Sequence, residues 1–186
     1  ETNKEQLTQE VNIILKKLQK IETIEPEHIA EISAIKLARQ KDNILAFGKD
    51  KTLYNINSLT KTVETQKHNS IPNLLYSTTP KSQDFILFAS GDRSIALYND
   101  QDKSLVSKDI IFTEETTAIA AMFIYNTRLY TLDRNTNQIY KHNKTLSGYD
   151  KGSSWLKDNS NVSQGISFAI DGDLYLLNEH GSIQKF

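Results

Sequence analysis

Apolar residues near the start of the chain follow the spacing of a helix. They recur in steps of four and three residues, at Leu7, Val11, Ile14, Leu18 and Ile21. This is the a/d spacing of a heptad seam, and lysine and glutamate fill the other faces. Pro26 disfavours helical backbone in the residue before it, so we expect residues 1–30 to form an amphipathic helix and a linker.

This helix has two interpretations. It packs on its own domain, or it forms a short coiled-coil stalk that joins the domain to a partner or to a membrane anchor. Only two to three heptads are present, which is marginal for an independent coiled coil.

From Ile32 onward the pattern changes to a period of two and becomes repetitive. Four segments begin with Asp or Asn and carry leucine at their fourth position, namely Leu45, Leu87, Leu129 and Leu174. The leucines are 42, 42 and 45 residues apart. A second set of aliphatic residues follows them, at Leu53, Ile95, Ile139 and Ile183, and three positions later stand Ile56, Tyr98, His142 and Phe186. Polar, turn-prone residues separate the two sets, so each repeat contains a β-hairpin.

Further strands flank each hairpin. We expect earlier strands at 32–37, 74–77, 118–124 and 166–170, and later strands at 62–66, 104–108 and 151–156. Four short antiparallel strands in about 42 residues are typical of a propeller blade, whose apolar faces are covered by neighbouring blades. The sequence therefore predicts an all-β partial β-propeller over residues 31–186. Its blades span 31–67, 71–109, 116–157 and 163–186, and the last lacks its outer strand.

The number of blades leaves three interpretations. We expect a fragment of a six- to eight-bladed propeller, because the sequence ends within a blade and Glu1 is not a native start. A half-ring could instead close by dimerisation, through the helix or the open blade edge. A small four-bladed ring could also take its last strand from elsewhere, such as the N-terminal segment.

The last hairpin carries a family resemblance. The segments 171–177 and 180–186 resemble blades of bacterial NHL/quinoprotein-like propellers. Residues 138–141 and 163–172, with Trp155 and Leu156 between them, are also similar to propeller regions of large single-pass bacterial membrane proteins. Some of these proteins carry a PPM-type phosphatase-like domain, whose acidic metal-binding motifs are not in this chain. The Gly-His and Trp-Asp pairs of a WD-type repeat do not close each blade.

Composition excludes several classes of function. The net charge is −1, and no basic stripe is present, which argues against nucleic acid and anionic membranes as partners. The chain has no cysteine, which excludes disulfides and thiolate chemistry. No stretch approaches the roughly 18 apolar residues of a membrane span. A membrane tether would therefore lie upstream of residue 1.

Acidic residues next to glycine or in hairpin turns were considered as metal ligands. Asp171 and Asp173 flank Gly172, and carboxylates are ligands of hard cations. The position of Asp171 is filled by Asp or Asn in every repeat, however, and these residues form turns. Asp100 and Asp102 have the same explanation. We therefore predict no metal site.

Motifs for catalysis or cofactor binding are absent from the sequence. The histidines lie outside any ligand spacing, at His28, His68, His142 and His180. Trp155, the single tryptophan, is interpreted as a packing residue of a blade, with a carbohydrate contact as the alternative. We predict no catalytic or cofactor-binding residue and no cofactor.

The function that fits this pattern is a non-enzymatic binding or scaffold module for a protein or saccharide ligand. We expect it to be the extracytoplasmic part of a larger membrane-anchored protein. Its recognition loops would lie at one mouth of the ring, and candidates are the turns at 48–51, 91–94 and 134–137. Two alternatives are a propeller enzyme (lyase, glycosidase or quinone-dependent dehydrogenase) and a membrane-linked sensor that uses the helix as a transmission stalk.

Overall fold

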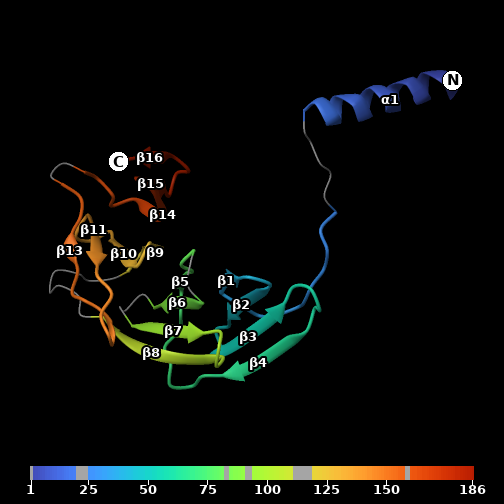
Figure 1. Ribbon diagram of the computed structural model, residues 1–186. Helices are drawn as coiled ribbons and strands as arrows, with labels where there is room; N and C mark the ends of the chain where they lie inside the picture. The colour runs from blue at the N-terminus through green and yellow to red at the C-terminus, as the bar shows by residue number, and fades with distance from the viewer. Residues whose placement is uncertain (1, 20–24, 82–83, 91–93, 111–118, 158–159) are drawn as a thin grey trace.

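In the part of the chain that it describes, the computed structural model has one helix and four largely antiparallel sheets (Figure 1). The structure describes residues 2–19, 25–81, 84–90, 94–110, 119–157 and 160–186. Helix α1 spans Thr2–Leu18, and all its described side chains, residues 3–18, are exposed. The helix therefore does not pack on the blades, and Ile21 of the expected seam lies outside the described residues. Residues 27–30, after Pro26, form no helical turn.

Each sheet is one blade of a propeller, which confirms the predicted fold class. The first blade contains β1 (Lys36–Gln40), β2 (Asn43–Phe47), β3 (Thr52–Asn57) and β4 (Val63–Lys67). The second contains β5 (Tyr76–Thr78), β6 (Phe85–Ala89), β7 (Ile95–Asn99) and β8 (Ser104–Ile110), with β12 (Gly148–Tyr149) added to its edge. The third contains β9 (Ala121–Tyr125), β10 (Arg128–Asp133), β11 (Gln138–His142) and β13 (Ser153–Ser154). The fourth has three strands, β14 (Gly165–Asp171), β15 (Asp173–Asn178) and β16 (Ile183–Lys185).

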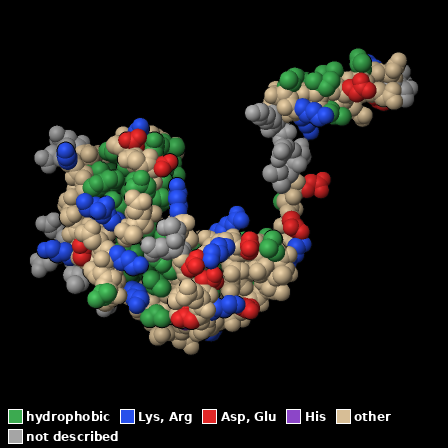
Figure 2. All heavy atoms as spheres, in the orientation of Figure 1, with side chains coloured by type: hydrophobic (Ala, Val, Ile, Leu, Met, Phe, Trp, Pro, Cys, Tyr) green, Lys and Arg blue, Asp and Glu red, His purple; other side chains and the backbone are tan. Residues whose placement is uncertain are grey.

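The blades follow one another around an arc. The first strand of each blade contacts the first strand of the next, so β1 meets β5, β5 meets β9, and β9 meets β14. Figures 1 and 2 show the arc open between the fourth blade and the first.

Four expected strands differ from the observed ones. The strands expected at 32–37, 74–77 and 118–124 begin later, at Lys36, Tyr76 and Ala121, and the strand expected at 151–156 is reduced to Ser153–Ser154. The apolar residues before β5 belong to the seam with the first blade, as Leu74 shows by its complete burial, whereas those before β1 line a pocket on the first blade. The hydrophobicity of Leu74 thus reflects packing between blades and not a strand.

Strand β12 was not expected from the sequence. The connection between β11 and β13 reaches back to the second blade, where β12 pairs in parallel with β8. Tyr149, at the end of β12, is buried in the seam between the second and third blades. This connection thus ties two blades together.

Every blade has two unlike faces, which we name by chain direction. The forward face packs on the next blade, and the rear face packs on the preceding one. Forward positions in the two central strands are Leu45, Phe47 and Leu53 in the first blade, Leu87, Ala89 and Ile95 in the second, and Tyr130, Leu132 and Ile139 in the third. The corresponding residues of the fourth blade are Tyr175, Leu177 and Ile183.

The leucine repeat does not mark one structural position. Leu45 and Leu87 lie on forward faces, whereas Leu129 and Leu174 lie on rear faces. The residues that match Leu45 in the third and fourth blades are Tyr130 and Tyr175, one position later. A shift of one residue along a strand moves a side chain to the opposite face. All four leucines are buried, but against different neighbours.

Candidate interaction surfaces

A polar pocket lies at one end of the seam between the first two blades. Its volume is about 570 Å³. The end of β1 and the connection from β5 to β6 line it, through Arg39, Gln40, Lys41, Thr79, Pro80, Lys81 and Asp84. This is the end of the blades where β1 turns into β2, so the pocket is opposite the turns at 48–51 that the sequence suggested.

The most unusual group in this pocket is the side chain of Gln40. The residue is 4% exposed, and neither its amide nitrogen nor its amide oxygen has a hydrogen-bond partner among the described residues. A buried amide without partners costs free energy, so a polar ligand or water that reaches it gains a hydrogen bond readily.

The charges around Gln40 are mainly positive. Lys41 pairs with Asp84 at 2.8 Å, and this carboxylate raises the pKa of Lys41 through its hydrogen bond and its charge. Lys81 is exposed and has no ion-pair partner among the described residues. Arg39 donates from Nε to the carbonyl oxygen of Lys41. The pocket therefore offers a buried amide beside uncompensated positive charge.

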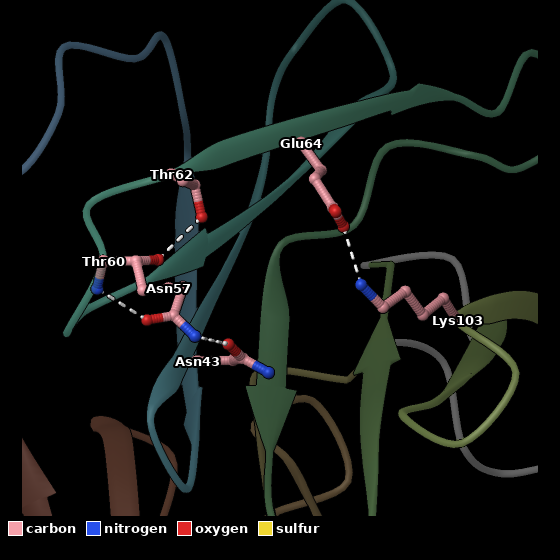
Figure 3. Close-up of polar contacts among 6 residues, drawn as sticks. All are labelled: Asn43, Asn57, Thr60, Thr62, Glu64 and Lys103. Atoms are coloured by element: carbon pink, nitrogen blue, oxygen red, sulfur yellow. Dashed lines mark hydrogen bonds and ion pairs between the residues drawn. The ribbon is translucent and has the colours of Figure 1, made fainter.

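A second, smaller pocket of about 200 Å³ lies on the outer side of the same seam. Asn55 Oδ1 and the Tyr98 hydroxyl both line it without a hydrogen-bond partner among the described residues. Burial raises the pKa of Tyr98 to about 12, so the hydroxyl keeps its proton. The ion pair between Glu64 and Lys103, 2.8 Å long, joins the two blades beside this pocket (Figure 3). Two orphan polar atoms facing a small space are well suited to holding water.

The same view shows how a repeated asparagine is used. Asn57 Oδ1 accepts from the backbone nitrogen of Thr60, and Asn57 Nδ2 donates to Asn43 Oδ1 (Figure 3). The same Oδ1 also accepts from the backbone nitrogen of Leu59. Asn99, the equivalent residue of the second blade, accepts from the backbone nitrogen of Gln101. Asn57 and Asn99 therefore both close turns.

The forward face of the fourth blade is open. Tyr175 and Ile183 are 37% and 70% exposed, whereas their counterparts Tyr130 and Ile139 are 4% and 0% exposed. Lys185 Nζ forms an ion pair with Asp173 Oδ2 at 2.7 Å, and the same ammonium group lies over the Tyr175 ring. Hydrophobic side chains are visible on the lobe that β14–β16 form (Figure 2). This surface has the composition of a blade seam without a neighbouring blade.

The acidic residues considered as metal ligands lie in turns. Gly172, with φ of 80°, turns the chain between Asp171 and Asp173. Asp102 accepts from the backbone nitrogen and the hydroxyl of Ser104, which lowers its pKa. No group of three or more His, Asp or Glu that could hold a metal is found in the part of the chain that the structure describes.

The four histidines are scattered, and only His142 lies in a dense network. It is fully buried, its Nε2 lies 2.9 Å from the Thr131 hydroxyl, and its Nδ1 lies 2.9 Å from the Asp150 carbonyl. The Asp150 carbonyl requires a proton on Nδ1, so the neutral ring satisfies both contacts. Burial lowers the pKa of His142. The Cβ of an alanine at Gly152 would lie 2.6 Å from the ring, so His142 holds the connection at 143–152 in place.

Trp155 packs within the third blade. Its ring lies 4.8 Å from that of Tyr130, and both residues belong to the seam with the fourth blade. The suggested recognition turns at 48–51 and 134–137 carry Asx-type contacts, such as that of Asp50 with Thr52. Residues 91–93 of the remaining turn lie outside the described residues.

The sequence did not single out Gln40. Its side chain is buried because it shares a face of β1 with Ala38. The only sequence signal was a glutamine in step with the buried positions of a strand. The two cavities depend on how neighbouring blades meet, which strand periodicity does not contain.

Among the described residues, no helix is long and apolar enough to cross a membrane. A scan against protein-family models and a search of curated proteins both find no match.

Comparison with solved structures gives the fold. The chain is similar to the computationally designed Ika4 protein, with a TM-score of 0.54 and 12% identity, over 88% of this chain and 94% of that one. It is also similar to U3-55K, with a TM-score of 0.55 and 11% identity, over 87% of this chain and 53% of that one. The RRP9 WD40 repeats give a TM-score of 0.55 and 11% identity, over 87% of this chain and 52% of that one. The chain thus spans about half the length of U3-55K and of the RRP9 WD40 repeats, and these similarities show that it has a β-propeller fold.

Proposed function

We propose that the chain is a non-enzymatic propeller scaffold that binds a protein partner, and that it recognises an extended acidic peptide segment at the Gln40 pocket. The observation that carries this proposal is the buried Gln40 amide, with both polar atoms unpartnered, beside Lys81. A primary amide can donate to a peptide carbonyl and accept from a peptide N–H. Lysine near such an amide favours a ligand with carboxylates.

The propeller fold supports the same conclusion. Propellers are rigid supports, and recognition takes place on the loops that they position. WD40 neighbours favour a protein ligand over the saccharide that the sequence left open. The NHL-like kinship, the membrane anchor and the extracytoplasmic location stay part of this proposal. In it, α1 acts as the stalk, because its apolar stripe is exposed.

The proposal is tested with a fluorescein-labelled hexaglutamate peptide, followed by fluorescence anisotropy, with hexalysine as the opposite-charge probe. We expect saturable binding of hexaglutamate alone. Lys81→Glu and Gln40→Leu should each weaken it about tenfold or more, because the first reverses a charge and the second removes the amide. Lys49→Glu, the same charge reversal in the turn after β2, is the matched control. Equal losses in K49E and K81E would indicate non-specific attraction and contradict the proposal, as would the absence of binding.

A further inference from the structure

Both ends of the arc present faces that are buried elsewhere in the molecule. The rear face of the first blade repeats that of the second at a distance of 42 residues, through the pairs Ile29 and Ile71, Ile32 and Leu74, Ile44 and Ile86, and Ile56 and Tyr98. All four residues of the second blade are buried in its seam with the first blade. Their counterparts Ile29, Ile32 and Ile44 are only half-buried.

This rear face is also hollow. A pocket of about 640 Å³ lies on it and is lined almost entirely by aliphatic side chains, among them Ile29, Ile32, Ile44 and Ile56. Leu37, on the same face of β1, is 58% exposed. In the second blade, the corresponding space is filled by Leu45, Phe47 and Leu53 of the blade before it.

Inside the arc, every seam is made in the same way. A forward face meets a rear face three times, and aromatic pairs bridge two of these seams. Phe47 and Phe88 lie 6.4 Å apart by ring centroids, and Phe123 and Phe168 lie 6.2 Å apart. The two unpaired faces at the ends of the arc are the forward face of the fourth blade and the rear face of the first blade. They are therefore complementary to each other, and neither is built to pack on its own copy.

We infer that a second copy of the chain closes the ring, with the forward face of each fourth blade packed on the rear face of the other copy's first blade. Such a head-to-tail contact closes when its rotation brings the second pair of faces together. The result is a ring of eight blades with two identical new seams. Burial of aliphatic and aromatic side chains drives the association.

Charge supports this choice of partner. Within the arc, Tyr125 on the forward side of β9 packs on the cluster that contains Ile170 of β14. The register of the strands makes Asp171 the counterpart of Tyr125, and Arg39 the counterpart of Ile170. In the proposed seam, an aspartate thus faces an arginine where the internal seam has an apolar contact.

The inference does not depend on peptide binding at the Gln40 pocket, because the two surfaces share no tested residue.

The experiment is sedimentation-velocity ultracentrifugation of the full chain and four variants over a range of micromolar concentrations. We expect the wild-type chain to sediment as a dimer. Ile183→Glu and Leu37→Glu, one at each end of the arc, should each raise the apparent dissociation constant about tenfold or more, because each buries an unpaired carboxylate. The matched control is Leu146→Glu, which changes a fully exposed leucine in the connection at 143–147 and should leave the dimer intact. The fourth variant, the double change V11S/I14S in α1, should also remain dimeric.

Each other outcome overturns the inference. A monomeric wild-type chain would leave both faces for a blade of different origin. A dimer broken by I183E and not by L37E would be a face-to-face pair of fourth blades. A dimer broken only by V11S/I14S would be held by the helices. Circular dichroism of each variant checks that it remains folded, so loss of the dimer is separable from loss of the fold.

Discussion

The third and fourth blades carry nearly the same forward face in opposite environments. Tyr130, Leu132 and Ile139 are covered by the next blade, whereas Tyr175 and Ile183 are exposed and Leu177 is half-buried. The same kinds of side chain therefore form a core in one place and an exposed patch in the other. The two faces differ in whether a neighbouring blade covers them. A blade face is therefore a potential interface, and it becomes part of a core only when another blade packs on it.

The largest expected effect is a difference in stability between two leucine substitutions at equivalent positions of the third and fourth blades. Leu132→Ala should lower the free energy of unfolding by about 3 kcal/mol, because the side chain is fully buried. Leu177→Ala should cost less than about 1 kcal/mol in the monomer, because half-buried carbon gains little from folding. Urea denaturation at a concentration where the chain sediments as a monomer measures both. Equal losses would mean that the fourth blade's forward face is already covered.

Two glycines with positive φ allow the packed and the open parts of the molecule to be compared at the backbone. Gly152 and Gly172 have φ of 73° and 80°, but only Gly152 faces a packed ring. Gly152→Ala should cost about 3 kcal/mol, from backbone strain and contact with His142. Gly172→Ala should cost about 1 kcal/mol from strain alone, because nothing lies near its added methyl group. Thermal unfolding followed by circular dichroism ranks the two, and a reversed order would contradict the packing around His142.

The stability of the folded chain should also depend on pH, through the buried ring of His142. Burial lowers the pKa of His142 in the folded chain below its ordinary value of 6.5, so folding favours the neutral ring. Stability should be complete above pH 6.5 and fall as the pH drops below it, because the unfolded chain then binds the proton more readily. Denaturation midpoints between pH 7.5 and 5.5 test this.

The variants separate the sources of this pH dependence. His142→Gln should flatten the slope. Burial also lowers the pKa of His68, which adds a smaller slope of the same sign that H68Q removes. An unchanged slope in H142Q would show that the ring is not the sensor.

The smallest effect concerns the open face itself. Lys185 donates a hydrogen bond to Asp173, and this contact and the charge of Asp173 raise the pKa of Lys185. Both side chains are exposed, and exposed ion pairs contribute little to stability. Asp173→Asn should therefore leave the urea midpoint of the monomer unchanged. A clear loss would mean that the pair orders the fourth blade.

The sequence predicted the blades because strand alternation and a period of about 42 residues are local signals. It placed all four leucines in the core, but it could not assign Leu129 and Leu174 to the rear face. That assignment depends on the length of each hairpin turn, since one residue reverses the side. The sequence predicts Ile29 in a linker and Ile32 in a strand, whereas both line the pocket on the rear face of the first blade.

The interaction surfaces were less predictable for the same reason. Gln40 stands in a strand whose neighbours give no hint of a pocket, and the pocket forms only when β1 and the connection after β5 meet. The exposed face of the fourth blade has the composition of a core, so its sequence alone indicates burial.

The most direct test of ring closure is cross-linking between two copies that each carry one introduced cysteine. The chain has no cysteine of its own, so the reagent joins only the introduced residues. Ala169→Cys and Leu37→Cys occupy the positions that correspond to the contacting pair Phe123 and Phe168. A short bis-maleimide reagent is added to each variant alone and to a mixture of the two. We predict a cross-linked dimer in the mixture and none in either variant alone, because the seam joins unlike faces. Cross-linking of A169C to itself, or no cross-link in the mixture, would contradict a ring closed by a second copy.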